Sequence, residues 1–326
     1  MPFSSACPLH PSPIQMDKWV ALMKLILILL VPILPVTPFA LRTHPEIPVR
    51  MPTPEAPKSS RSSSLAPVDG SRRAPSPFTE REIRRRSEKW EVLRLEIPGW
   101  VLLMTDSFAI RSDGPPAELR AAGVYLEEAH RLHREMLGGD SSDLRFSVRV
   151  FRQEKDFRIY AQCRGVPEAA SFYDPGGAEV VVPYSGNRNG LVCALMHEFC
   201  HQYLHRVFGV TRPIWLTEGL AEYFTFYSVG IGRLVPGADS PAHRERLRAA
   251  RKDGTLIPLR RLIAMSREEF YSGNVLLAYA EAWALIRVLL SKRGDVHADP
   301  IGALLRGGSL GDLQSLDEEW SQSMIE

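Results

Sequence analysis

The stretch that decides the fold is Leu191–Phe208, LVCALMHEFCHQYLHRVF, which is apolar on nearly every side. Such a run predicts a buried helix, which we expect over residues 190–208. His197 and His201 stand four residues apart, so both imidazoles leave the same face of this helix and can reach one cation. Glu198, next to His197, can face the same space without binding the cation. Two fixed imidazoles with a carboxylate beside them are what a zinc hydrolase needs.

A second stretch, Trp215–Phe224 (WLTEGLAEYF), contains the expected third ligand. A turn with Gly209 and Pro213 precedes it, and two helices joined by a short connection can face each other. Glu218 then completes a His, His, Glu set, one of the standard ligand sets of catalytic zinc, so Zn²⁺ is the expected cofactor. Glu222, one turn later, either holds a ligand histidine through its free ring nitrogen or is an ordinary solvated residue.

The two stretches resemble the signature of the gluzincin metallopeptidases, His-Glu-x-x-His followed by a Glu within Trp-Leu-x-Glu-Gly-x-Ala, and are most similar to the small bacterial peptidase-MA-like proteins. The resemblance implies that His197, His201 and Glu218 bind zinc and that Glu198 is the general base. It also implies that Tyr279, in a long helix after the site, donates to the oxyanion. Simple packing against its helix neighbours is the alternative for this side chain.

Two departures limit what the resemblance implies. Sixteen residues separate His201 from Glu218, fewer than in the large gluzincin aminopeptidases, and no Gly-x-Met-Glu-Asn element is found for gripping a free amino terminus. Aminopeptidase activity is therefore not implied. The metzincin pattern would need a third histidine at Val207, which excludes that class.

Other histidines and a cysteine near these stretches have simpler interpretations. His205 continues the four-residue spacing, but three ligands along two helical turns cannot converge on one ion. His130 and His133 are expected on the solvated face of an earlier helix. Cys200 is expected to pack in the core.

The order of elements, strands first and helices after, favours an α+β domain. We expect strands at 92–97, 100–104, 146–151 and 180–183, and helices at 118–137, 190–208, 216–227, 241–252, 266–272, 274–293 and about 311–325. Pro183 places strand 180–183 at a sheet edge, where Val180–Val182 could pair with an extended substrate. The resemblance implies a zincin-like arrangement, with a small mixed sheet and its edge strand over the active-site helix, followed by a helical C-terminal subdomain.

The N-terminal part has a different composition. Residues 1–41 contain an apolar segment, 19–40, which favours an export signal, with an uncleaved membrane anchor as the alternative. Residues 42–81 are rich in Pro, Ser and Arg and are expected to be a disordered linker. Residues 82–326 would then form the metallopeptidase domain. We expect it in the periplasm, outside the cell, or anchored to the membrane and facing away from the cytoplasm.

The net charge of the chain indicates which kinds of partner to expect. Forty basic and 38 acidic residues leave a formal net charge of +2, so we expect no nucleic-acid partner. The expected partner is a peptide or protein substrate, and the membrane is a second partner if the N-terminal segment is not cleaved.

The predicted activity is that of a zinc-dependent hydrolase, a peptidase in which a zinc-bound water activated by Glu198 attacks an amide carbonyl. The alternative is a non-catalytic, zinc-containing envelope module that uses a degenerate peptidase fold for binding. Glu198 favours the enzyme, because a structural zinc site needs no general base and is usually closed by a fourth protein ligand.

Overall fold

The computed structural model describes residues 78–184, 186–209, 212–230, 233–291 and 300–308, together with Leu310, Leu316, Asp317 and Trp320. The expected export segment, nearly all of the expected linker and most of the predicted helix at 311–325 lie outside these residues. Among the helices that are described, none combines the length and the apolar character needed to cross a membrane.

The described chain begins with a side chain that belongs to the core. Phe78 is buried, and its ring meets that of Tyr125 edge to face at 5.3 Å between centroids. Helix α2 (Glu80–Ser87) follows, opened by a capping box between Thr79 and Glu82. The folded unit therefore includes residues 78–81, which composition alone assigns to the linker. The expected boundary at residue 82 falls inside α2, which Thr79 caps.

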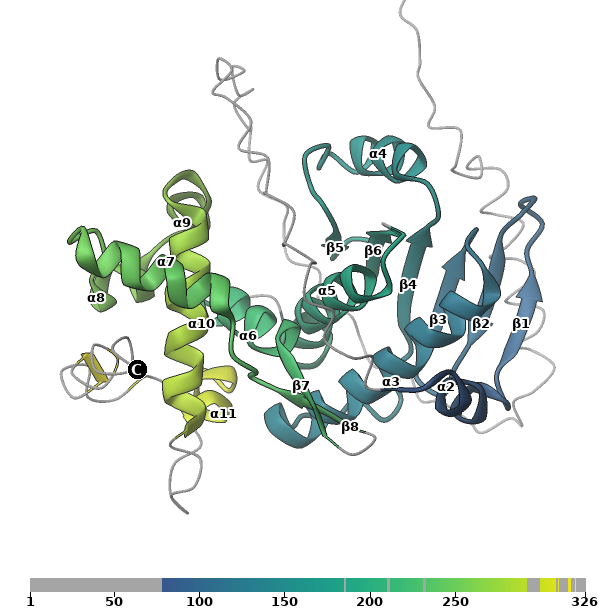
Figure 1. Ribbon diagram of the computed structural model, residues 1–326, viewed down its shortest axis with the longest axis horizontal. Coiled ribbons are helices and arrows are strands. Elements are labelled where there is room, and N and C mark those ends of the chain that lie inside the picture. Colours follow the sequence, from purple (N-terminus) through teal and green to yellow (C-terminus); the bar gives the residue numbers. More distant parts are fainter. Residues whose placement is uncertain are drawn as a thin grey trace, which may run out of the picture. The chain divides into compact units, whose positions relative to one another are not determined.

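A six-stranded mixed sheet holds the first part of the fold together, in the order β1-β2-β3-β4-β6-β5 (Figure 1). The strands are β1 (Glu91–Arg94), β2 (Val101–Met104), β3 (Phe108–Ser112), β4 (Phe146–Phe151), β5 (Phe172–Asp174) and β6 (Glu179–Pro183). Strands β3, β4 and β6 run parallel, whereas the other neighbouring pairs are antiparallel. With the helices below, this confirms the predicted α+β class.

The edge of the sheet near α5 is β5, which corrects the prediction from Pro183. Strand β6 pairs with β4 on one side and, at Glu179–Val181, with β5 on the other, so Val180 and Val181 have no free edge. Pro183 is tolerated because it is the last residue of the strand. The next N–H, that of Tyr184, donates to the carbonyl oxygen of Phe151 at 2.6 Å.

Helices cover both faces of the sheet at this end. In β6, Val180 and Val182 point into the main core, where α3 (Pro116–Leu137) and α5 (Arg188–Phe208) pack. Val181 points the other way, into a smaller cluster under α4 (Glu154–Cys163). Strands covered on both faces explain the continuous valine run, which does not alternate as a solvated strand would.

The second part of the chain is mostly helical (Figure 1). It contains α6 (Ile214–Thr225), the hairpin β7 (Tyr227–Gly230) and β8 (Arg233–Pro236), α7 (Pro241–Lys252), α8 (Leu259–Ala264), α9 (Arg267–Ser272), α10 (Val275–Ser291) and α11 (Pro300–Leu305). Helix α10 packs along α6 and also touches α7. The β7–β8 hairpin, α8 and α11 have no counterpart among the predicted elements.

Two histidines of α3 are buried, so their predicted place on a solvated face is wrong. His130 lies between the hydroxyls of Ser107 and Ser141, at 2.9 and 2.8 Å. His133 bonds the carbonyl oxygen of Ala129 at 2.7 Å and stacks on a phenylalanine ring of α6. Burial lowers the pKa of His130 to about 4 and that of His133 to about 3, so both are neutral core residues.

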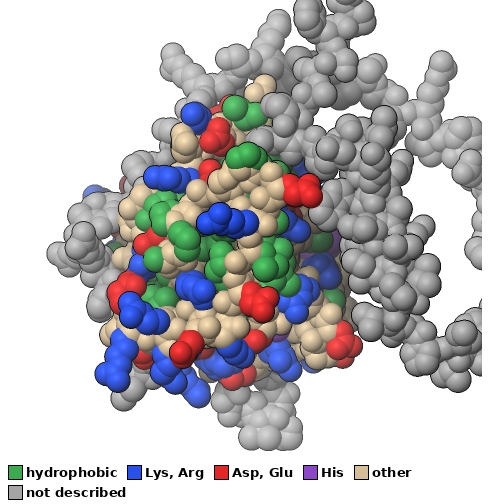
Figure 2. Space-filling model, turned by 90° about the vertical axis from the view of Figure 1, so that its right-hand side faces the viewer, with side chains coloured by type: hydrophobic (Ala, Val, Ile, Leu, Met, Phe, Trp, Pro, Cys, Tyr) green, Lys and Arg blue, Asp and Glu red, His purple; other side chains and the backbone are tan. Residues whose placement is uncertain are grey.

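The opposite edge of the sheet, β1, is far from β5 in the strand order. Figure 2 shows this side of the molecule, where apolar side chains lie among lysines, arginines and acidic residues. Leu93 and Ile97 are 45% and 44% exposed there, while Glu91 and Arg94 put both signs of charge on the edge strand. Charges on an exposed edge discourage pairing with other chains.

A buried carboxylate in α10 makes the stability of this fold depend on pH. Glu281 is fully buried, and burial raises its pKa from 4.5 to about 8, against the smaller lowering effect of the hydrogen bond from the Ile257 N–H. The folded state therefore keeps a proton that the unfolded chain has lost between these two values. This contribution to stability is complete below about pH 4.5 and is lost as the pH rises through about 8.

We predict that Glu281→Gln removes this contribution. Between about pH 5 and 8, the free energy of unfolding of the wild type should fall relative to that of the variant, by at most about 1.4 kcal/mol per pH unit. Urea unfolding at a series of pH values measures the difference. Parallel curves for the two proteins would contradict the buried, protonated carboxyl.

Candidate metal centre

Helices α5 and α6 bring three potential ligand groups together. Nε2 of His197 and Nε2 of His201 lie 3.2 Å apart. Oε2 of Glu218 lies 3.5 Å from the first nitrogen and 3.4 Å from the second. These three residues form the group of possible metal ligands found among the described residues. The three atoms thus mark a nearly equilateral triangle.

The triangle has the size that a tetrahedral metal ion requires. Donors about 2.0–2.1 Å from zinc in tetrahedral geometry lie about 3.3–3.4 Å from one another. Oε2 of Glu218 is also a buried oxygen to which no described residue donates a hydrogen bond, on a side chain only 3% exposed. A buried, unbonded carboxylate oxygen aimed at two imidazole nitrogens is costly unless a cation compensates it. The residues present therefore fit a divalent metal ion.

The pKa shifts of Glu218 and His197 also fit a divalent metal ion. Burial opposes a charged Glu218, but the nearby His201 and His197 hold the pKa of that carboxyl well below its usual range. Burial likewise opposes a charged His197, yet its contacts with Glu218 and Glu222 raise its pKa well above the usual value. The cluster holds an ionised carboxylate, and a metal ion could replace the proton on His197.

Tyr271 holds the other oxygen of Glu218, the third candidate ligand. Its hydroxyl donates to Oε1 of Glu218 at 2.6 Å, which leaves Oε2 directed at the histidines. Tyr271 lies in the short helix α9, and the motifs contain no sign of it. The capping box at Ser266 predicts that helix, but its place beside α6 depends on tertiary packing.

Glu222 contacts His197, a candidate ligand, and this contact excludes the interpretation of Glu222 as a solvated residue. Oε1 of Glu222 lies 3.2 Å from Nδ1 of His197, the ring nitrogen that faces away from the cluster. The side chain is 14% exposed, so Glu222 is not a solvated helix residue. The hydroxyl of Thr225 lies near the same nitrogen, at 3.4 Å. A carboxylate in this position orients the ring and raises its basicity.

Glu198 lies beside the cluster, and Ser171, the residue before the edge strand β5, holds its side chain. The hydroxyl of Ser171, directly before β5, donates to Oε1 of Glu198 at 2.7 Å. No described residue bonds Oε2, so one carboxylate oxygen remains available to a reacting group. Ser171 is a second residue that the motifs do not indicate.

Tyr279 reaches the site from α10. Its ring centroid lies 6.4 Å from that of His197, and the ring also meets Phe270 at 5.5 Å. Its hydroxyl interacts with that of Tyr271. Burial, reinforced by the charge of Glu218, raises the pKa of Tyr279, so the phenol stays protonated and can donate a hydrogen bond. Tyr279 therefore both packs and faces the cluster.

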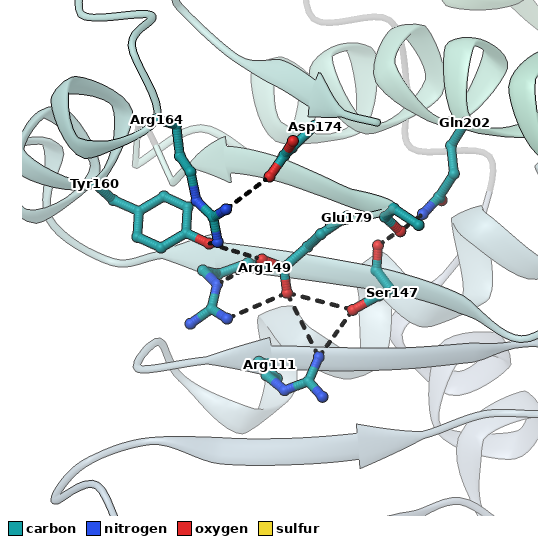
Figure 3. Close-up of polar contacts among 9 residues, drawn as sticks. Arg111, Ser147, Arg149, Tyr160, Arg164, Asp174, Glu179 and Gln202 are labelled. Carbon is teal, nitrogen blue, oxygen red and sulfur yellow. Dashed lines mark hydrogen bonds and ion pairs between the residues drawn. The ribbon is translucent and has the colours of Figure 1, made fainter. Parts of the chain in front are cut away.

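A polar network on the far face of the sheet fixes the strands next to the site (Figure 3). The buried carboxylate of Glu179 in β6 accepts hydrogen bonds from Arg149 at 2.9 Å and from Tyr160 at 3.1 Å. Arg164, at the end of α4, pairs with Asp174 at 3.1 Å, where β5 ends. Both ends of the β5–β6 turn are thus tied to α4 and β4.

Gln202 joins this sheet to α5, the helix that carries His197 and His201. It follows His201 directly and is fully buried. Its amide nitrogen donates to the carbonyl oxygens of Ser147, at 3.0 Å, and Ala178, at 2.7 Å (Figure 3). The histidine position along α5 is therefore coupled to the register of β4 and β6.

Two further residues lie outside the cluster, as the sequence predicts. Cys200 is buried in the core, and burial raises the pKa of its thiol well above the usual value. His205 bonds the hydroxyl of Tyr173 through Nδ1 at 2.5 Å.

One protein family matches the segment of the chain that contains the site. A family described as a protein of unknown function (DUF1570) matches residues 191–305. The matched segment contains all three candidate ligands, Glu198, Tyr271 and Tyr279, and excludes the six-stranded sheet. Comparison with curated proteins finds no match. The chain is similar over this segment to a family whose description names no activity, so function must be argued from the site.

Gly219, which follows the candidate ligand Glu218, lets α6 and α10 touch. A Cβ at Gly219 would lie 2.7 Å from the carbonyl oxygen of Ala282 and 2.8 Å from Cγ1 of Ile286. Such distances require a backbone shift, because a carbonyl oxygen cannot rotate away as a flexible side chain can. Gly219 therefore sets the approach of α10 at the point where Glu218 enters the cluster.

We predict that Gly219→Ala destabilises the protein by about 1–3 kcal/mol, the usual cost of overpacking. In an open helix position the same change would stabilise by up to about 1 kcal/mol through helix propensity, so the sign decides between the two effects. Chemical denaturation in a chelator, which removes any contribution of bound metal, measures the change. A variant as stable as the wild type would contradict the close contact of α6 and α10.

Proposed function

We propose that this protein is a zinc-dependent hydrolase of the gluzincin type, with a zincin-like fold, that cleaves amide bonds in peptides. The observation that carries the proposal is the triangle of His197, His201 and Glu218 donors beside Glu198, whose Oε2 no described residue bonds. The proposed cofactor is Zn²⁺, held by these three residues. When bound, zinc supplies a Lewis acid that polarises the substrate carbonyl and makes a water molecule easier to deprotonate.

Glu198 moves the protons in the proposed reaction. Ser171 fixes Oε1, so Oε2 can take a proton from the attacking water and then deliver it to the leaving nitrogen. A single carboxylate can serve as base and then as acid because the proton it gains in the first step is the one it gives in the second. A purely structural metal site would need no such group.

The two phenols on the C-terminal side have separate roles in the proposal. Tyr279 donates to the oxyanion that forms on the carbonyl, since its raised pKa keeps it protonated. Tyr271 orients Glu218 through the bond to Oε1 and keeps Oε2 turned toward the metal.

The free edge of β5 favours a peptide over a small ester as substrate. Strand β5 has one neighbour in the described sheet, β6, and Ser171 at its start touches the proposed base. An extended peptide added along β5 would therefore pass next to Glu198. Backbone pairing with an edge strand binds a peptide without requiring a particular side chain.

The apolar segment 19–40, which favours an export signal, supports action outside the cytoplasm.

We predict that Glu198→Gln abolishes hydrolysis while metal binding persists. The amide keeps the size and the bond from Ser171 but cannot accept a proton, so turnover should fall by about a hundredfold or more. Mass spectrometry of a peptide library incubated with each protein measures cleavage. Glu281→Gln, a buried glutamate variant that does not belong to the cluster, should cleave like the wild type at neutral pH. Unchanged turnover in Glu198→Gln would remove the proposed mechanism and would leave a non-catalytic binding module as the better interpretation.

A further prediction separates the carboxylates of α6. Glu218→Ala should lose most of its zinc, because two histidines alone form an incomplete site. Glu222→Ala should keep zinc but bind it roughly ten- to a hundredfold more weakly, as expected for the loss of a carboxylate behind a ligand histidine. Zinc titration against a colorimetric chelator measures both. If Glu222→Ala empties the site while Glu218→Ala stays loaded, the assignment of the third ligand is reversed.

A further inference from the structure

We infer that His243 is a positioning residue that strengthens metal binding by holding Glu222 against His197. This inference rests on the proposed metal site but not on the proposed reaction. His243 lies in the first turn of α7, 46 residues after His197, and belongs to neither of the motif stretches.

The contacts form a continuous chain to the cluster. Nε2 of His243 lies 2.8 Å from Oε2 of Glu222, and Oε1 of the same carboxylate lies 3.2 Å from Nδ1 of His197. Nε2 of His197 then faces His201 and Glu218. Each oxygen of Glu222 thus serves one histidine, and the orientation of the carboxylate is fixed from both sides.

The surroundings of His243 hold its ring in this orientation. The ring packs between Phe226, at 5.1 Å, and Trp283, at 5.3 Å between centroids. Its own backbone N–H donates to Ser240, the cap of α7, at 3.3 Å. The side chain is 8% exposed, so the contact with Glu222 is shielded from water. A buried, packed imidazole fixes its partner better than a flexible surface side chain would.

The arrangement also indicates what would happen without His243. Oε2 of Glu222 would lose its hydrogen bond in a largely buried place, so the carboxylate would gain by turning toward water or another donor. Nδ1 of His197 would then be left with the hydroxyl of Thr225 at 3.4 Å. A neutral hydroxyl raises the basicity of an imidazole much less than a carboxylate does. We therefore expect weaker metal binding at His197.

The test measures zinc affinity of the full chain by competition with a chelator. His243→Phe keeps an aromatic ring between Phe226 and Trp283 but cannot bond Glu222, and should bind zinc about tenfold more weakly. His243→Gln keeps a side-chain N–H of similar reach and should bind within about threefold of the wild type. His243→Asn is too short to reach Glu222 and should resemble His243→Phe, so it replaces that variant if the latter does not fold.

The deciding comparison repeats the substitution in Glu222→Ala protein. If His243 acts through Glu222, His243→Phe changes nothing further in that background. Equal weakening in both backgrounds, or wild-type affinity of His243→Phe and His243→Asn, would overturn the inference. If His243 only stabilised the fold, replacing it would lower the unfolding temperature of the chelator-treated protein. Its effect on zinc affinity would then not depend on Glu222. If the wild type does not bind zinc, the proposed metal site itself is contradicted.

Discussion

A buried carboxylate pointed at two imidazoles is the feature on which the rest of this structure depends. Glu218 is 3% exposed, and one of its oxygens has no hydrogen bond in the described part of the chain. Removing such a charge from water costs several kcal/mol unless a positive partner is in place. His197, whose pKa its contacts with Glu218 and Glu222 raise, provides that partner only while α5 and α6 stay in register. The proposed zinc ion would supply the compensation more fully than shared protons can.

The groups around this cluster come from segments far apart in the chain. Ser171 before β5 holds Glu198, Tyr271 in α9 holds Glu218, and His243 in α7 holds Glu222. Each of these outer residues bonds one oxygen of a glutamate and leaves the other for the site. All three glutamates therefore use their two oxygens in the same way, one for the outer residue and one for the site. A carboxylate can do this because both of its oxygens accept hydrogen bonds. The fold positions the outer residues, while α5 and α6 carry the inner ones.

The inner part of the site could be predicted from sequence because its spacings are local. Four residues along a helix put His197 and His201 on one face, and a short turn brings Glu218 to them. The outer part could not, since Ser171, Tyr271 and His243 meet the glutamates only after α7, α9 and the edge strand have packed. The same limit applies to His130 and His133, whose partners come from other segments, and an amphipathic pattern alone places them wrongly in water.

The sheet illustrates a different limit. The residues of β6 indicate a strand, but they do not say which strands lie beside it. Pro183 suggests an edge, yet a proline at the end of a strand removes only one ladder bond, and Tyr184 supplies a donor at that point. The edge belongs to β5, a strand of three residues that is too short to leave a pattern in the sequence. This difference matters for function, because it moves the expected place of the substrate next to Ser171 and Glu198.

Zinc-edge X-ray absorption on the purified full chain tests the central claim most directly, because it reports both the metal and its ligands. The account predicts about one zinc ion per chain, with nitrogen and oxygen donors at about 2.0–2.1 Å, two of them imidazoles, and no sulfur. The signal should disappear in a His197→Ala, His201→Ala double variant that still folds. A chain without zinc after purification and reloading, or zinc bound by the thiols of Cys193 and Cys200, would contradict the account.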